Sequence, residues 1–128
     1  DYHMMRVLLR TGALSIADGH LKTSLQKREA LGSDKEIRQA CIESIRYIAR
    51  ESGKSIPSLN DYLWPLGRSC CYEYPLCKYG KCAKDPCSFY LIADISKHKE
   101  CIFNGCCKAV KEQSYMDLWE PCVQTHYY

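Results

Sequence analysis

The chain of 128 residues has no apolar run near the length of about 18 residues that a membrane-spanning helix needs. The only apolar stretch near its start, residues 4–14, is interrupted by Arg6 and Arg10, which is not typical of a signal peptide. The net charge of +3 is too small to indicate nucleic acid or an anionic membrane as a partner. These absences argue against a membrane-spanning protein and leave a chain long enough for one domain.

The sequence also lacks the residues that a small secreted enzyme of this size would use. A secreted phospholipase A2 needs a His-Asp pair beside a Cys-Cys pair to activate water, and a glycine-rich loop for calcium. Tyr-Glu-Tyr follows Cys70–Cys71, and Lys-Ala-Val follows Cys106–Cys107. We therefore predict that the protein is not an enzyme and uses no cofactor.

Cysteine is absent from residues 1–40 and abundant after them. The chain contains ten cysteines: Cys41, Cys70, Cys71, Cys77, Cys82, Cys87, Cys101, Cys106, Cys107 and Cys122. An even number of clustered cysteines predicts up to five disulfides with no free thiol, although the sequence leaves their pairing open. Because disulfides persist in oxidising compartments, we expect a secreted, extracellular protein.

A metal site is the alternative for the same cysteines. Cys77, Cys82 and Cys87 are evenly spaced, and His98 and His126 are available as further ligands. Structural zinc sites usually contain two tight Cys-x2-Cys pairs, and this sequence contains none. The cysteine pattern therefore favours disulfides, and we predict no metal.

Lys27 and Arg28 are the only adjacent basic residues, and they directly precede the region that holds every cysteine. Such a pair is typical of cleavage by a subtilisin-like processing protease, although it also suits a solvated helix end. Residues 1–28 carry five basic and two acidic residues, whereas residues 29–128 carry thirteen of each. We predict a propeptide over 1–28, dispensable for folding, and a cysteine-rich helical domain over 29–128.

The clearest secondary-structure pattern predicts a helix over 34–51. Ser33 and Glu36 have the spacing of a capping box, and Gly53 provides a stop. Apolar residues recur at helical spacing and predict one buried stripe, which comprises Ile37, Cys41, Ile45 and Ile48. Cys41 lies in this stripe, so we expect its disulfide to tether the helix to the cysteine-rich half.

Further helices are predicted over 89–102, beginning after Ser88, and over 105–119, beginning after Asn104. A short helical turn before them is expected to end at Pro65. Because alternating β-type patterns are scarce, the expected fold class is mainly α, small and disulfide-rich.

The segment Cys70-Cys71-Tyr72-Glu73-Tyr74-Pro75-Leu76-Cys77 resembles one in the con-ikot-ikot family of large disulfide-rich cone snail venom peptides. The order of a cysteine-free segment, a Lys-Arg pair and a cysteine-dense region is similar to that of cone snail toxin precursors. This family is mainly helical and oligomeric, and it acts on glutamate-gated channels. The resemblance implies a toxin-like protein that binds and modulates a membrane receptor or ion channel, and it implies self-association into a homo-oligomer.

Tyr72, Tyr74 and Tyr79 lie in the loop between Cys70 and Cys87 and are the candidate contact residues. Tyrosine buries a large area while keeping a polar tip, which suits a binding surface, although it equally suits a small core.

A second resemblance supports a different class of function. The segment from Cys101 to the Cys106–Cys107 pair resembles the trefoil module, and Trp119 lies near the final cysteine, Cys122. In trefoils the tryptophan directly precedes that cysteine, whereas two residues intervene here. This resemblance implies a secreted module that binds mucin, another glycan or protein.

Overall fold

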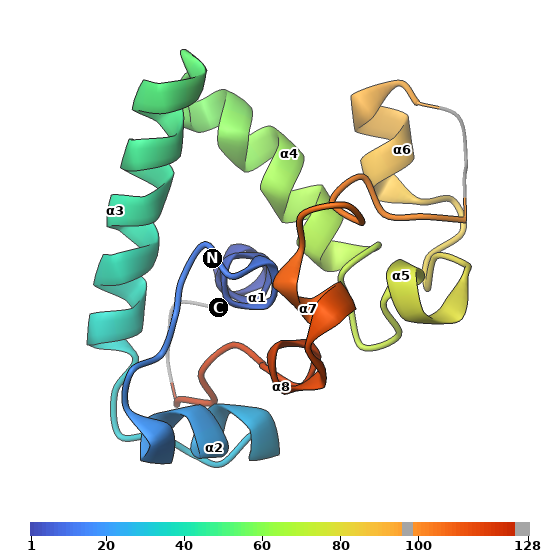
Figure 1. Cartoon of the computed structure of the whole chain (residues 1–128). Coiled ribbons are helices and arrows are strands. Elements are labelled where there is room, and N and C mark those ends of the chain that lie inside the picture. Colours follow the sequence, from blue (N-terminus) through green and yellow to red (C-terminus); the bar gives the residue numbers. More distant parts are fainter. Residues whose placement is uncertain (96–98, 125–128) are drawn as a thin grey trace.

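A computed structural model describes residues 1–95 and 99–124, and these form a mainly helical structure without strands. The first four helices carry most of the fold: α1 (Tyr2–Thr11), α2 (Gly19–Lys27), α3 (Lys35–Ser52) and α4 (Ile56–Arg68). Four short helices follow: α5 (Leu76–Tyr79), α6 (Ser88–Ala93), α7 (Lys108–Lys111) and α8 (Gln113–Met116). Figure 1 shows α1 in the centre, with the other elements arranged around it.

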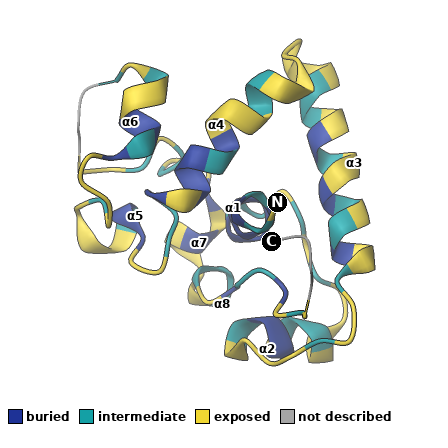
Figure 2. Ribbon diagram, turned by 180° about the vertical axis from the view of Figure 1, so that it is seen from behind, coloured by how far each residue is buried: buried dark blue, intermediate teal, exposed yellow. Residues whose placement is uncertain are grey.

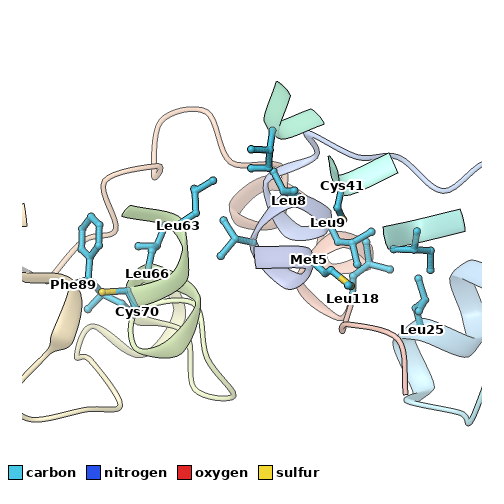
Figure 3. Packing of buried hydrophobic residues seen from close by; sticks show 14 of the residues in the cluster. Met5, Leu8, Leu9, Leu25, Cys41, Leu63, Leu66, Cys70, Phe89 and Leu118 are labelled. Carbon is cyan, nitrogen blue, oxygen red and sulfur yellow. The ribbon is translucent and has the colours of Figure 1, made fainter. Parts of the chain in front are cut away.

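Helix α1 forms the centre of the hydrophobic core. Its apolar residues Met5, Val7, Leu8 and Leu9 are all at most 2% exposed. They pack with side chains from α3, α4 and the C-terminal segment, including Leu118 (Figure 3). A helix of ten residues is marginal alone in water, so burial on several sides stabilises it.

The packing does not divide the chain at Arg28. Helix α1 contacts α3, α4, α7 and α8, and Figure 2 shows it as the most continuously buried helix. The described residues after Arg28 therefore share a core with residues 1–28, and the dispensability of residues 1–28 for folding stays a prediction. Arg6 and Arg10, which interrupt the apolar stretch of residues 4–14, are both buried.

Helix α1 approaches α4 closely at Gly67. A Cβ atom on Gly67 would lie 2.5 Å from the carbonyl oxygen of His3, so this crossing requires glycine.

The helix predicted over 34–51 is confirmed, with α3 running from Lys35 to Ser52. Gly53 ends it with a left-handed φ of 67°. The predicted capping box does not form, because Asp34 occupies the cap position and its carboxylate pairs with Arg38. The predicted stripe faces the core: Ile37, Cys41 and Ile45 are buried and Ile48 packs against them.

Helix α4 continues through Pro65, which sequence analysis expected to end it. Ser55 caps the helix by accepting the Ser58 N–H at 3.2 Å. Pro65 is buried inside the helix, and its carbonyl accepts hydrogen bonds from the N–H and the hydroxyl of Ser69. Packing of α4 against α1 and α6 offsets the free-energy cost of the backbone hydrogen bond that Pro65 cannot donate.

The two later helices are shorter than predicted. Helix α6 ends at Ala93, rather than at 102, because Asp94 takes a left-handed conformation with φ 49°. The predicted helix over 105–119 is two short helices, since Glu112 is extended between α7 and α8. Across residues 1–95 and 99–124, no helix is long and apolar enough to cross a membrane.

Candidate functional site

The tyrosine-rich loop over residues 70–87 places its three tyrosines in two different environments. Tyr74 and Tyr79 pack edge to face, with ring centroids 5.5 Å apart. Both are well exposed, at 59% and 50%. This pair results from α5, which returns the chain after Pro75 and ends at Gly80 with φ 68°. The predicted residues Tyr74 and Tyr79 therefore form one exposed aromatic surface.

Tyr72, the third predicted contact residue, lies in a separate cleft of about 530 Å³. We call this the aromatic–cationic cleft, and it is lined by Asp1, Tyr2, His3, Trp64, Arg68, Tyr72 and Lys84. Arg68 lies over the Trp64 ring at 5.0 Å, and Lys84 lies over the Tyr72 ring at 5.2 Å. Both cations are exposed, so the cleft presents aromatic faces beside positive charge.

Two residues of α1 that lie at this cleft, His3 and Arg6, were not predicted from the sequence as site residues. Arg6 is 1% exposed and lies 5.2 Å from the centroid of the Tyr72 ring. Its Nη2 lies 3.0 Å from His3 Nδ1 and donates to the Gly67 carbonyl at 2.8 Å. A signal was available, because His3, Arg6 and Arg10 recur at helical spacing and share one face.

Arg6 also connects α1 to both flanking segments of the chain. Its Nε donates to the Cys71 carbonyl at 2.9 Å, and its Nη1 pairs with Glu120 at 2.6 Å. Arg10 acts in parallel, donating to the carbonyls of Leu118 and Tyr72. The start of the tyrosine-rich loop is thus held by the guanidinium groups of α1.

Burial and the neighbouring Arg6 guanidinium lower the pKa of His3 to about 4. A neutral His3 can accept the Arg6 N–H at Nδ1, whereas a protonated one cannot. Between pH 6.5 and about 4, His3 therefore stays neutral in the folded chain, whereas an ordinary histidine becomes protonated.

Three cysteines of this loop lie close together. The sulfurs of Cys70, Cys82 and Cys87 all lie within 4.8 Å of one another, and Cys70 and Cys87 are 3.6 Å apart. Burial raises the pKa of the Cys70 thiol above its usual range. We call these three residues the first thiol cluster; they have the composition either for one disulfide or for an incomplete set of soft metal ligands.

Four other cysteines gather around a small internal cavity of about 20 Å³. This second thiol cluster comprises Cys71, Cys77, Cys101 and Cys107. The even spacing of Cys77, Cys82 and Cys87 does not bring those three together, since Cys77 belongs to the second cluster. His98 and His126, the other candidate ligands, lie outside the described residues.

The remaining cysteines lie apart from these clusters. Cys106 and Cys122 are exposed, whereas Cys41 is buried on α3. Burial raises the pKa of Cys41 to about 11, and the charged side chains that act on it are Arg38 and Asp34. Cys41 therefore faces the core as predicted, and its expected disulfide to the cysteine-rich half stays a prediction.

Lys27 and Arg28, the predicted processing pair, lie at the end of α2. Arg28 is the C-cap residue, with φ 57°. Its guanidinium lies 4.2 Å from the Trp119 ring centroid and pairs with Glu73 at 3.3 Å. A protease that binds an extended strand would have to unwind this helix end.

No protein-family model, curated protein or solved structure matches this chain in the comparisons.

We predict that His3 makes the fold sensitive to acid. Between pH 6.5 and about 4, the unfolded chain binds a proton at His3 that the folded chain does not. The free energy of unfolding should therefore fall as pH falls through this window. Urea unfolding measured from pH 7 to pH 4 tests this, with His3→Asn expected to flatten the dependence because asparagine retains an acceptor.

The matched control is His20→Asn, which removes an exposed histidine on α2. A wild-type pH dependence in the His3→Asn protein would contradict the assignment.

Proposed function

We propose that this chain is a secreted, non-enzymatic, toxin-like protein that binds and modulates a membrane receptor or ion channel through its tyrosine-rich loop. The observation that carries the proposal is that one loop contributes residues to two candidate contact surfaces. Residues 70–87 carry the exposed Tyr74–Tyr79 pair, and the same loop contributes Tyr72 and Lys84 to the aromatic–cationic cleft.

The residue types at this surface are those that dominate binding energy in protein interfaces. Tryptophan, tyrosine and arginine are enriched among such residues, and Trp64, Arg68 and Tyr72 line the cleft together. A cleft of this kind accepts a protruding side chain, while the exposed tyrosine pair offers an aromatic contact surface.

Charge indicates the chemistry of the partner. Arg68 and Lys84 are exposed beside the aromatic rings, whereas Arg6 is already neutralised by Glu120. Among the described residues, Asp1 is the one acidic residue that lines the cleft, and its carboxylate accepts the His3 N–H at 2.7 Å. The surface therefore suits an acidic segment on the extracellular face of a receptor.

Disulfides would preorganise this surface. The two thiol clusters hold seven of the ten cysteines, and five of these seven lie between residues 70 and 87. Crosslinks in both clusters would hold the loop in its bound shape and reduce the ordering entropy that opposes binding. Such crosslinks require an oxidising compartment, which is the basis for proposing secretion.

Glycan binding, the function implied by the trefoil resemblance, has less support from the position of Trp119. The Arg10 and Arg28 guanidinium groups lie 4.8 and 4.2 Å from its ring centroid. Because these cations occupy positions over the ring, the side chain is not a free platform for stacking against a sugar.

We predict that bridges in the native protein form within the two thiol clusters. Alkylation of the unreduced, denatured protein, followed by peptide mapping, should show one bridge within Cys70, Cys82 and Cys87. Two bridges should join Cys71, Cys77, Cys101 and Cys107, because these four cysteines line the same cavity.

Two results together would contradict the disulfide prediction. All three thiols of the first cluster would be labelled, and mass spectrometry would detect zinc in the native protein.

We predict that Tyr74→Ala weakens the effect on the target by about tenfold to a hundredfold, or roughly 1–3 kcal/mol, because this ring is an exposed anchor. Electrophysiology on a panel of ligand-gated and voltage-gated channels measures this, with a mucin-binding assay run in parallel. Tyr47→Ala is the matched control, since Tyr47 on α3 is 57% exposed.

Mucin binding without an effect on any channel would contradict the proposal and favour the trefoil-like function. Equal losses in Tyr74→Ala and Tyr47→Ala would show that the loop is not the contact surface.

A further inference from the structure

A second concave site, unrelated to the tyrosine-rich loop, lies between α1 and α3 at the start of α4. It has a volume of about 310 Å³. Its wall is built from Met4, Met5 and Leu8 of α1 and from Cys41 and Ile45 of α3. Figure 3 shows Met5, Leu8 and Cys41 in this part of the core. Four of these five residues are buried and apolar, so the interior of the pocket excludes polar ligands.

The edge of the pocket differs from its wall. Ile42 and Ile56 also line the pocket and are 41% and 48% exposed. They extend the apolar surface from the interior to the solvent. A ligand with a continuous apolar chain would cover both isoleucines as it enters.

Positive charge lies at the same edge. Arg38 and Arg46 both line the pocket from α3. Arg38 is paired with Asp34, whereas Arg46 is exposed and forms no ion pair with another described residue. The acidic residue at the pocket, Asp1, accepts the His3 N–H. Arg46 is thus the cation available to an anionic ligand.

We propose that this pocket binds a single-chain amphipathic carboxylate, such as a medium-chain fatty acid. The alkyl chain lies against the methionine, leucine and isoleucine side chains, and the carboxylate pairs with Arg46. The volume lies at the lower end of the range for small-molecule sites, which fits one chain rather than a two-chain lipid. The arginine fork matches a carboxylate, and it gives the site a preference for an anion over a neutral chain.

The three methionines allow a direct test in the intact protein. Met4 and Met5 line the pocket, whereas Met116 lies beside the second thiol cluster. The protein carries ¹³C-labelled methionine methyl groups and is titrated with decanoate below its micelle concentration. Saturable shifts of the Met4 and Met5 methyl resonances, with Met116 unchanged, are expected. Equal shifts at all three, or no saturable shift, would overturn the proposal.

Variants at the edge test the head-group contact. Arg46→Gln should weaken decanoate binding about fivefold to tenfold, because it removes the charged pair, and should leave binding of decan-1-ol unchanged. Arg50→Gln, on the same helix and outside the pocket, is the control and should change neither. Equal affinity of the wild-type protein for decan-1-ol and decanoate, or an unchanged Arg46→Gln protein, would overturn the anion assignment.

A second copy of the chain is the competing occupant. Methyl shifts of Met4 and Met5 that appear with rising protein concentration, without decanoate, would identify self-association and overturn the proposal. Because Tyr74 does not line this pocket, failure here leaves the proposed receptor function untouched.

Discussion

The fold depends on two buried arginines of α1. Arg6 and Arg10 are 1% and 2% exposed, and a charge in this position is costly unless its donors are satisfied. Arg6 satisfies this requirement through the Gly67 and Cys71 carbonyls and the Glu120 carboxylate. Because these partners come from distant parts of the sequence, the arginines specify where α1, the tyrosine-rich loop and the C-terminal segment meet.

This arrangement explains why the first 28 residues and the described part of the cysteine-rich region share one core. The arginine contacts surround an apolar core in which Leu9 is fully buried, so polar and apolar interactions select the same position for α1. The same guanidinium of Arg6 lies beside Tyr72, which fixes the base of the aromatic–cationic cleft. Any function of that cleft therefore depends on α1, although sequence analysis placed all binding residues beyond residue 70.

Local patterns predicted the fold where local interactions decide it. Helix α3 was predictable because its apolar spacing is regular and Gly53 follows it. Helix α4 was not, since Pro65 is a helix breaker unless tertiary packing compensates. The length of helix α6 was overestimated because the sequence gives no clear sign that Asp94 takes a left-handed conformation. Composition left open whether the loop tyrosines are exposed or buried, and the role of Arg6 required knowledge of its distant partners.

The most direct test of the account is hydrogen exchange of the Arg6→Met protein. This substitution keeps a flexible, unbranched side chain but removes the charge, so Glu120 loses its partner, which should lower the free energy of unfolding by about 3–5 kcal/mol. Hydrogen exchange should increase in residues 67–72 and 118–120 before it increases in α3. Arg50→Met is the control, because the Arg50 side chain is 71% exposed, and its exchange should match that of the wild-type protein. Unchanged protection of both segments in the Arg6→Met protein would contradict the claim that this arginine organises the fold.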